Sequence, residues 1–84
     1  MRLDKFLKAS RIIKRRTLAN EACAGGRVRV NGRVAKPSAE VKAGDVIELS
    51  LGRRTLRVQV RDTAEHVQKE DAGSMYCVIE GEGD

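Results

Sequence analysis

Residues 25–33, GGRVRVNGR, contain the pattern that decides the predicted fold of this chain of 84 residues. The RVRV segment alternates polar and apolar residues, as a half-buried β-strand does. The Asn31–Gly32 pair that follows is typical of a two-residue type I′ turn, so we predict a β-hairpin. Three valines of the hairpin should face the core and three arginines the opposite side: Val28, Val30 and Val34 against Arg27, Arg29 and Arg33.

Two short helices are predicted before the hairpin. The first has an apolar stripe at helical spacing, formed by Leu3, Phe6, Leu7 and Ser10. A basic connector follows at residues 11–16. We expect its two isoleucines, Ile12 and Ile13, to anchor the connector to the core.

The second helix is predicted to begin at Thr17 and to end before a pair of glycines. The hydroxyl of Thr17 can accept a hydrogen bond from a backbone amide one turn later, which is how an N-cap stabilises a helix. The expected buried stripe is formed by Leu18, Ala22 and Cys23. Gly25 and Gly26 should end the helix, because glycine adopts the left-handed conformation without steric cost.

Strands dominate the rest of the chain. Apolar and polar residues alternate in residues 46–51, and they alternate again around Leu56, Val58 and Val60 after a turn. Residues 62–74 are polar and acidic, which predicts a loop or a loose helix. Residues 75–79 could add a last strand, followed by a frayed end at residues 80–84.

The order of these elements predicts an α+β fold, in which two N-terminal helices pack on a small, mainly antiparallel sheet. Residues 1–61 form the predicted domain. Residues 62–84 form an acidic loop followed by a short C-terminal strand or tail.

Positive charge is concentrated in the first 36 residues. They contain eleven Lys and Arg against two acids, a balance of +9, whereas the rest of the chain has six bases against ten acids, a balance of −4. The net charge of +5 therefore understates the asymmetry. Because the bases lie on predicted helices and strands, they indicate a structured surface that attracts a polyanion.

RNA is the polyanion that the pattern favours. Lys and Arg neutralise phosphates with release of counterions, and arginine adds planar bidentate contacts. The chain has no zinc-finger spacing, leucine zipper or helix-turn-helix signature for duplex DNA. With one Phe, one Tyr and no Trp, it offers no aromatic platform for loose single strands. We therefore expect folded RNA; the alternative is a basic face that only keeps a small protein in solution.

We expect no enzyme activity, no metal site and no cofactor. His66 is the only histidine in the sequence, and it has no Ser or Cys near it to act as a nucleophile. A disulfide between Cys23 and Cys77 is possible by count, but free buried thiols in a cytoplasmic protein fit better. No apolar run approaches the roughly 20 residues of a membrane span. The expected protein is a cytoplasmic monomer without membrane contact.

Three segments resemble the RNA-binding domain named after small-subunit ribosomal protein four: MRLDKFL, then RRTLANEACAGGRVRVNG, then VKAGDVI. The resemblance covers about residues 1–51 and implies two helices packed on a small sheet. It implies that RNA binds at the start of the second helix and at the hairpin. Arg16 and Thr17 match an Arg-Ser/Thr pair of that family, and Arg27 and Arg29 match polar positions of its first strand.

Nearly the full chain is similar to the RqcP (YabO) family, a stand-alone version of this domain related to heat-shock protein fifteen. The resemblance implies a quality-control factor that binds large ribosomal subunits obstructed by peptidyl-tRNA and contacts rRNA and tRNA. Such a factor helps an RqcH-type partner add an alanine tail to the stalled chain. Two alternatives remain: a general rRNA-binding accessory factor in ribosome assembly or the heat-shock response, and a regulator that binds an acidic protein.

The predicted RNA-binding residues lie in the first helix, the connector, the start of the second helix and the hairpin: Arg2, Lys5, Arg11, Lys14, Arg15, Arg16, Thr17, Arg27, Arg29, Asn31 and Arg33. Asn31 is also needed for the turn conformation. Asp4 is expected to pair with Lys8 one helical turn later or, alternatively, to shape the basic site beside Arg2. The arginines near the second helix and those of the hairpin are expected to form one surface.

Overall fold

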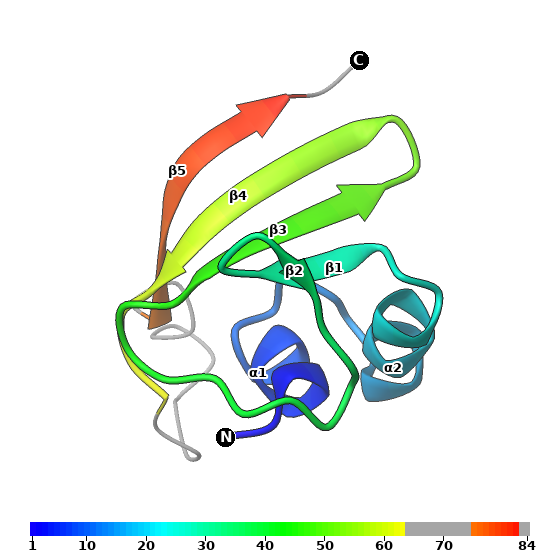
Figure 1. Ribbon diagram of the computed structural model, residues 1–84, viewed down its shortest axis with the longest axis horizontal. Helices are drawn as coiled ribbons and strands as arrows, with labels where there is room; N and C mark the ends of the chain where they lie inside the picture. Colours follow the sequence, from blue (N-terminus) through cyan, green and yellow to red (C-terminus); the bar gives the residue numbers. More distant parts are fainter. Residues whose placement is uncertain (64–74, 83–84) are drawn as a thin grey trace.

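Two helices precede five strands along the chain. The computed structural model describes residues 1–63 and 75–82. Its elements are α1 (Leu3–Ala9), α2 (Arg16–Ala24), β1 (Val28–Val30), β2 (Arg33–Val34), β3 (Val46–Leu51), β4 (Arg54–Val60) and β5 (Tyr76–Glu82). The strands form one antiparallel sheet in the order β2-β1-β3-β4-β5, and both helices lie on the same side of it (Figure 1). The predicted α+β class is confirmed.

The core lies between the helices and the inner face of the sheet. The predicted stripe of α1 is fully buried there, with Phe6 as its largest side chain. The sheet contributes a row of apolar residues that includes Val28, Ile47, Leu49, Val58 and Val60. Burial of each such side chain stabilises the fold by about 1.5–3 kcal/mol. The connector is anchored as expected, since Ile13 is buried and Ile12 packs against the core.

Helix α1 is seven residues long and depends on a distant segment for its first turn. The amide of Leu3 donates to the carbonyl of Ala39 at 2.8 Å, and that of Asp4 donates to Pro37 at 3.1 Å. The amide of Lys5 donates to the Asp4 carboxylate at 2.7 Å. The start of α1 is therefore fixed by the loop before β3.

The predicted start and buried stripe of α2 were wrong in detail. The helix begins at Arg16, after an extended Arg15, and no side chain caps it, so Thr17 is not the N-cap. The buried residues are Ala19, Ala22 and Cys23, whereas Leu18 is 48% exposed. Successive helical residues are rotated by about 100°, so a face centred on residues 19, 22 and 23 turns Leu18 outward. Gly26, with φ of +76°, ends the helix as predicted.

The hairpin is confirmed, but the faces of β2 were assigned the wrong way round. Asn31 and Gly32 have φ of 52° and 84°, as a type I′ turn requires. A two-residue turn pairs Val30 with Arg33 and Arg29 with Val34. Directly paired residues share a face. Val34 therefore lies on the outer face with Arg29 and is 60% exposed, and Arg33 lies on the face of Val30.

Strands β3 and β4 match the predicted pattern, and β5 confirms the predicted last strand. β5 continues to Glu82, so the frayed end expected from residue 80 was wrong for residues 80–82. The predicted loop or loose helix at residues 62–74 lies almost entirely outside the described residues. Cys23 and Cys77 are free thiols as predicted, but the expectation that both are buried was wrong for Cys77. Cys77 is exposed because it lies in the edge strand β5, beside the exposed Gln59 of β4. No helix within the described residues is long and apolar enough to span a membrane.

Candidate nucleic-acid interface

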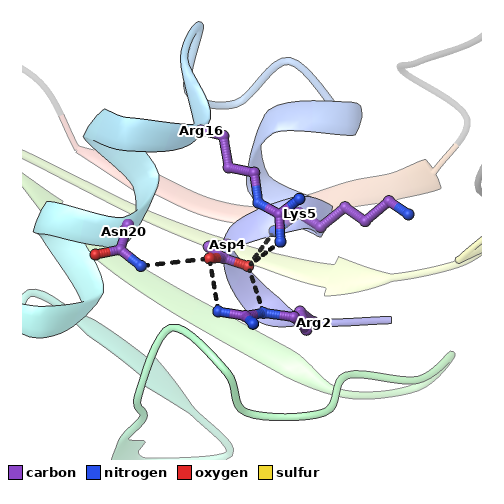
Figure 2. Close-up of polar contacts among 5 residues, drawn as sticks. All are labelled: Arg2, Asp4, Lys5, Arg16 and Asn20. Atoms are coloured by element: carbon purple, nitrogen blue, oxygen red, sulfur yellow. Dashed lines mark hydrogen bonds and ion pairs between the residues drawn. The ribbon is translucent and has the colours of Figure 1, made fainter.

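A buried carboxylate, Asp4, lies between the starts of the two helices (Figure 2). Arg2 donates to it through Nε and Nη2, each at 3.2 Å. From α2, Arg16 approaches the carboxylate at 3.5 Å and Asn20 donates to it at 3.4 Å. The carboxylate also accepts the Lys5 amide already described. We call Arg2, Asp4, Arg16 and Asn20 the Asp4 cluster.

These contacts correct the expected pairing of Asp4 with Lys8. In the part of the chain that the structure describes, the partners of Asp4 are Arg2, Lys5, Arg16 and Asn20. The reason is that Asp4 is 2% exposed and faces α2, whereas Lys8 is exposed to solvent. The contact with Arg2 agrees with the alternative expectation, that Asp4 shapes the basic site beside Arg2.

The Asp4 cluster keeps its carboxylate charged and its arginines accessible. Burial alone would raise the pKa of Asp4, but hydrogen bonds from Arg2, Asn20 and the Lys5 amide, with the charge of Arg16, lower it below the ordinary value. Each of the two arginine side chains is 49% exposed. Two guanidinium groups against one carboxylate leave a net positive charge. The cluster therefore presents oriented donors to an anion.

The start of α2 adds a second positive feature to the same place. No side chain caps it and its own first turn contains no acid, so α2 itself supplies no negative charge to offset the positive end of its dipole. The neighbouring residues Lys14, Arg15, Arg16 and Thr17 are all exposed. A phosphate group at this position would meet both fixed charges and backbone amides.

Asn31 has a structural role that the sequence only partly indicated. Its Nδ2 donates to Asp45 at 3.1 Å, and its Oδ1 accepts the amide of Val46 at 3.0 Å. The other oxygen of Asp45 accepts the amide of Lys42 at 3.0 Å. The NG turn is thereby joined to the Gly44–Asp45 turn before β3. An RNA contact by Asn31 stays a prediction.

The structure divides the predicted binding residues between two sides of the molecule. Arg2 and Arg16 meet on the helix side, at Asp4. Arg29 alternates with the buried Val28, so it projects from the outer face of the sheet. The remaining basic residues of the prediction lie around these two positions and are exposed, except for the half-buried Lys5: Lys5, Arg11, Lys14, Arg15, Arg27 and Arg33.

Sequence reasoning missed Asn20 and the central position of Asp4 in the cluster. The available signal was an acid placed between Arg2 and Lys5 in a strongly basic segment. Among residues 1–63 and 75–82, no group of three or more His, Cys, Asp or Glu side chains is placed to hold a metal ion. The burial of Cys23 and the charge of Asp4 raise the pKa of that thiol to about 11.

Comparison with known proteins places this arrangement in a family. The S4 domain family matches residues 1–47. The protein named RQC P-site tRNA stabilizing factor in Bacillus subtilis (strain 168) is 48% identical over 82 residues, which cover 98% of this chain and 95% of that protein. The chain belongs to the RQC P-site tRNA stabilizing factor family. The resemblance to the RqcP family stated from the sequence is confirmed.

Solved structures support the same S4-type fold for this family member. Heat Shock Protein 15 of Vibrio cholerae, described as trimeric, has a TM-score of 0.85 and 34% identity, and the match covers 93% of this chain and 80% of that chain. The solution structure of the hypothetical protein HP1423 has a TM-score of 0.80 and 35% identity, with 95% and 98% covered. The relation to heat-shock protein fifteen is thereby confirmed.

Proposed function

We propose that this chain is a cytoplasmic, ribosome-associated quality-control factor. It binds large ribosomal subunits obstructed by peptidyl-tRNA, contacts rRNA and tRNA, and supports C-terminal alanine tailing of the stalled chain by an RqcH-type partner. The observation that carries the proposal is the 48% identity, over 98% of this chain, to a factor named for stabilising P-site tRNA.

The Asp4 cluster supports RNA binding at the helix side. Arg2 and Arg16 hold their guanidinium groups in place through one shared carboxylate, so less side-chain freedom is lost when they bind a phosphate. Arginine forks match phosphate oxygens bidentately. The proposed RNA contacts are the residues predicted from the sequence, with Arg16 as the most important one.

The proposed role is positioning rather than catalysis. A basic surface can hold rRNA and tRNA in a fixed relation while the peptidyl-transferase centre of the large subunit forms each bond. The protein then needs no nucleophile, metal or cofactor of its own, and it acts as a monomer on the subunit.

The test is co-sedimentation of an Arg16→Gln variant with large ribosomal subunits. Glutamine is preferable to glutamate here, because a second carboxylate beside Asp4 would destabilise the fold by repulsion. Arg53→Gln, in the exposed turn between β3 and β4, removes the same charge as a control. We expect Arg16→Gln to leave the subunits and Arg53→Gln to remain bound. Normal co-sedimentation of a folded Arg16→Gln variant would contradict this placement.

A general rRNA-binding role in ribosome assembly or the heat-shock response is the second candidate, favoured by the TM-score of 0.85 with Heat Shock Protein 15. Sedimentation after induced stalling separates the two. The quality-control role predicts enrichment on subunits that carry nascent chains. Equal binding to empty and obstructed subunits would favour the second candidate.

A further inference from the structure

A cleft of about 250 Å³ lies at the outer face of the sheet. This is the face that the two helices do not cover (Figure 1). It is lined by Gly26, Arg27, Arg29, Glu48, Ser50 and Thr55. The register places Arg29 opposite Glu48 and Ser50 opposite Thr55. Side chains from β1, β3 and β4 therefore point to the same side and meet in this outer-face cleft.

The single carboxylate of the cleft is already engaged. Glu48 lies 3.5 Å from Arg57, its partner in the register of β3 with β4. Within the part of the chain that the structure describes, the side chains of Arg27, Arg29, Ser50 and Thr55 make no hydrogen bond or ion pair. The cleft thus offers two guanidinium groups and two hydroxyl groups to a ligand.

We propose that Arg27 and Arg29, with the hydroxyls of Ser50 and Thr55, form a second phosphodiester-binding subsite, separate from the Asp4 cluster. The guanidinium groups supply charge and paired donors, and the hydroxyls donate to the remaining phosphate oxygens. Glu48 lowers the affinity of the subsite because it places a negative charge beside the phosphate. The ligand is the backbone of RNA, so the inference rests on the proposed function.

The location of Arg27 explains how one RNA surface could include both sites. Arg27 also lines a groove against α2, together with Leu18 and Gly25. It therefore lies at the border between the helix side and the outer face. An acidic protein could also recognise two arginines, but the two hydroxyl donors beside them suit a phosphate group.

The first experiment measures binding to purified bacterial large ribosomal subunits that carry peptidyl-tRNA, over a range of salt concentrations. The double variant Arg27→Gln, Arg29→Gln should bind at least about tenfold more weakly, with a shallower salt dependence, because each lost phosphate contact reduces the slope by about one. Ser50→Ala with Thr55→Ala should weaken binding less, and Glu48→Gln should strengthen it. Arg53→Gln is the charge-matched control, and melting curves verify that each variant is folded.

The second experiment removes the ribosome. The 15N-labelled chain is titrated with uridylyl-uridine, a dinucleotide with one phosphodiester, and amide shifts are followed by NMR. We expect shifts at residues 26–29, 50 and 55 that persist in Arg16→Gln and disappear in the Arg27→Gln, Arg29→Gln variant.

The outcomes separate the subsite from the proposed function. If Arg16→Gln abolishes subunit binding and the Arg27→Gln, Arg29→Gln variant binds normally, the subsite is refuted and the proposed function stands. If the wild-type chain does not bind subunits that carry peptidyl-tRNA, the proposed function fails, and the dinucleotide shifts alone decide whether the cleft binds phosphodiesters. Weaker binding by Glu48→Gln would also overturn the subsite. So would a pull-down in which the Arg27→Gln, Arg29→Gln variant still binds RNA but loses a protein partner that the wild-type chain retains after nuclease treatment.

Discussion

Replacement of Asp4 by asparagine tests whether one carboxylate organises the basic end of the molecule. Asparagine keeps the shape and can still accept the Lys5 amide. The retained oxygen can also accept the bond from Arg2 Nε, but an NH₂ group replaces the oxygen that accepts from Arg2 Nη2 and from Asn20. The substitution also removes the negative charge that pairs with the guanidinium groups of Arg2 and Arg16.

The expected cost of Asp4→Asn is about 2 kcal/mol. Hydrogen bonds to charged groups contribute about 1.5–3 kcal/mol each when buried, and we take less because both arginines are half exposed to solvent. For a domain of this size, about 2 kcal/mol corresponds to a melting temperature lower by about 10 °C. Differential scanning calorimetry at neutral pH measures this shift. Glu21→Gln makes the same chemical change at an exposed position of α2 and should have little effect.

A pH series adds a sharper test of the same carboxylate. Because the pKa of Asp4 is lowered in the folded state, its stabilisation is complete above the unfolded value of about 3.9 and is lost as pH falls through the folded value. The difference in melting temperature between wild type and Asp4→Asn should therefore shrink in acid. A difference below about 3 °C at neutral pH, or one that is the same in strong acid, would refute the reasoning.

Two further predictions concern the hairpin turn and the thiols. Asn31→Ala should destabilise the protein by about 2–3 kcal/mol, because it loses the hydrogen bonds to Asp45 and Val46 and because alanine adopts the positive φ of this turn unfavourably. Asn31→Gly loses the same bonds but tolerates the positive φ, so it should cost about 1 kcal/mol less. Equal melting temperatures of the two variants would contradict this account. At neutral pH a maleimide should modify the exposed Cys77 quickly, and the buried Cys23, whose pKa is raised to about 11, only after unfolding. Mass spectrometry measures the labelling, with a Cys77→Ser variant as the control. Rapid labelling of both thiols in the folded protein would be inconsistent with the structure.

Local patterns predicted most of the fold because they depend on near neighbours. The stripe of α1 and the NG turn require only spacing and conformational preference, and both were confirmed. The errors at Leu18 and Val34 have another cause. Leu18 and Ala19 both fit a helical stripe with Ala22 and Cys23, and packing against the core selects the face that carries Ala19. The face of Val34 was assigned from its hydrophobicity, although a two-residue turn pairs it with Arg29 on the outer face.

The binding residues were harder to place than the elements that carry them. Charge identified the basic segment, but the partner of Asp4 depends on how α1 packs against α2, which no spacing within α1 encodes. Nor does the sequence show that Arg16 and Arg29, both in the basic segment, lie on different sides of the sheet. Only the tertiary arrangement shows that one site is built around a carboxylate and the other around a cleft.

The way α1 is held has a consequence for any attempt to shorten this protein. A helix of seven residues is not stable alone, and its first amides are satisfied by carbonyls of Pro37 and Ala39. A synthetic peptide that ended at α2 would therefore contain Arg2, Asp4 and Arg16 without the framework that brings them together. Recognition at this end of the molecule is a property of the cooperatively folded unit, and a minimal binding fragment must extend at least as far as the segment that closes over the first helix.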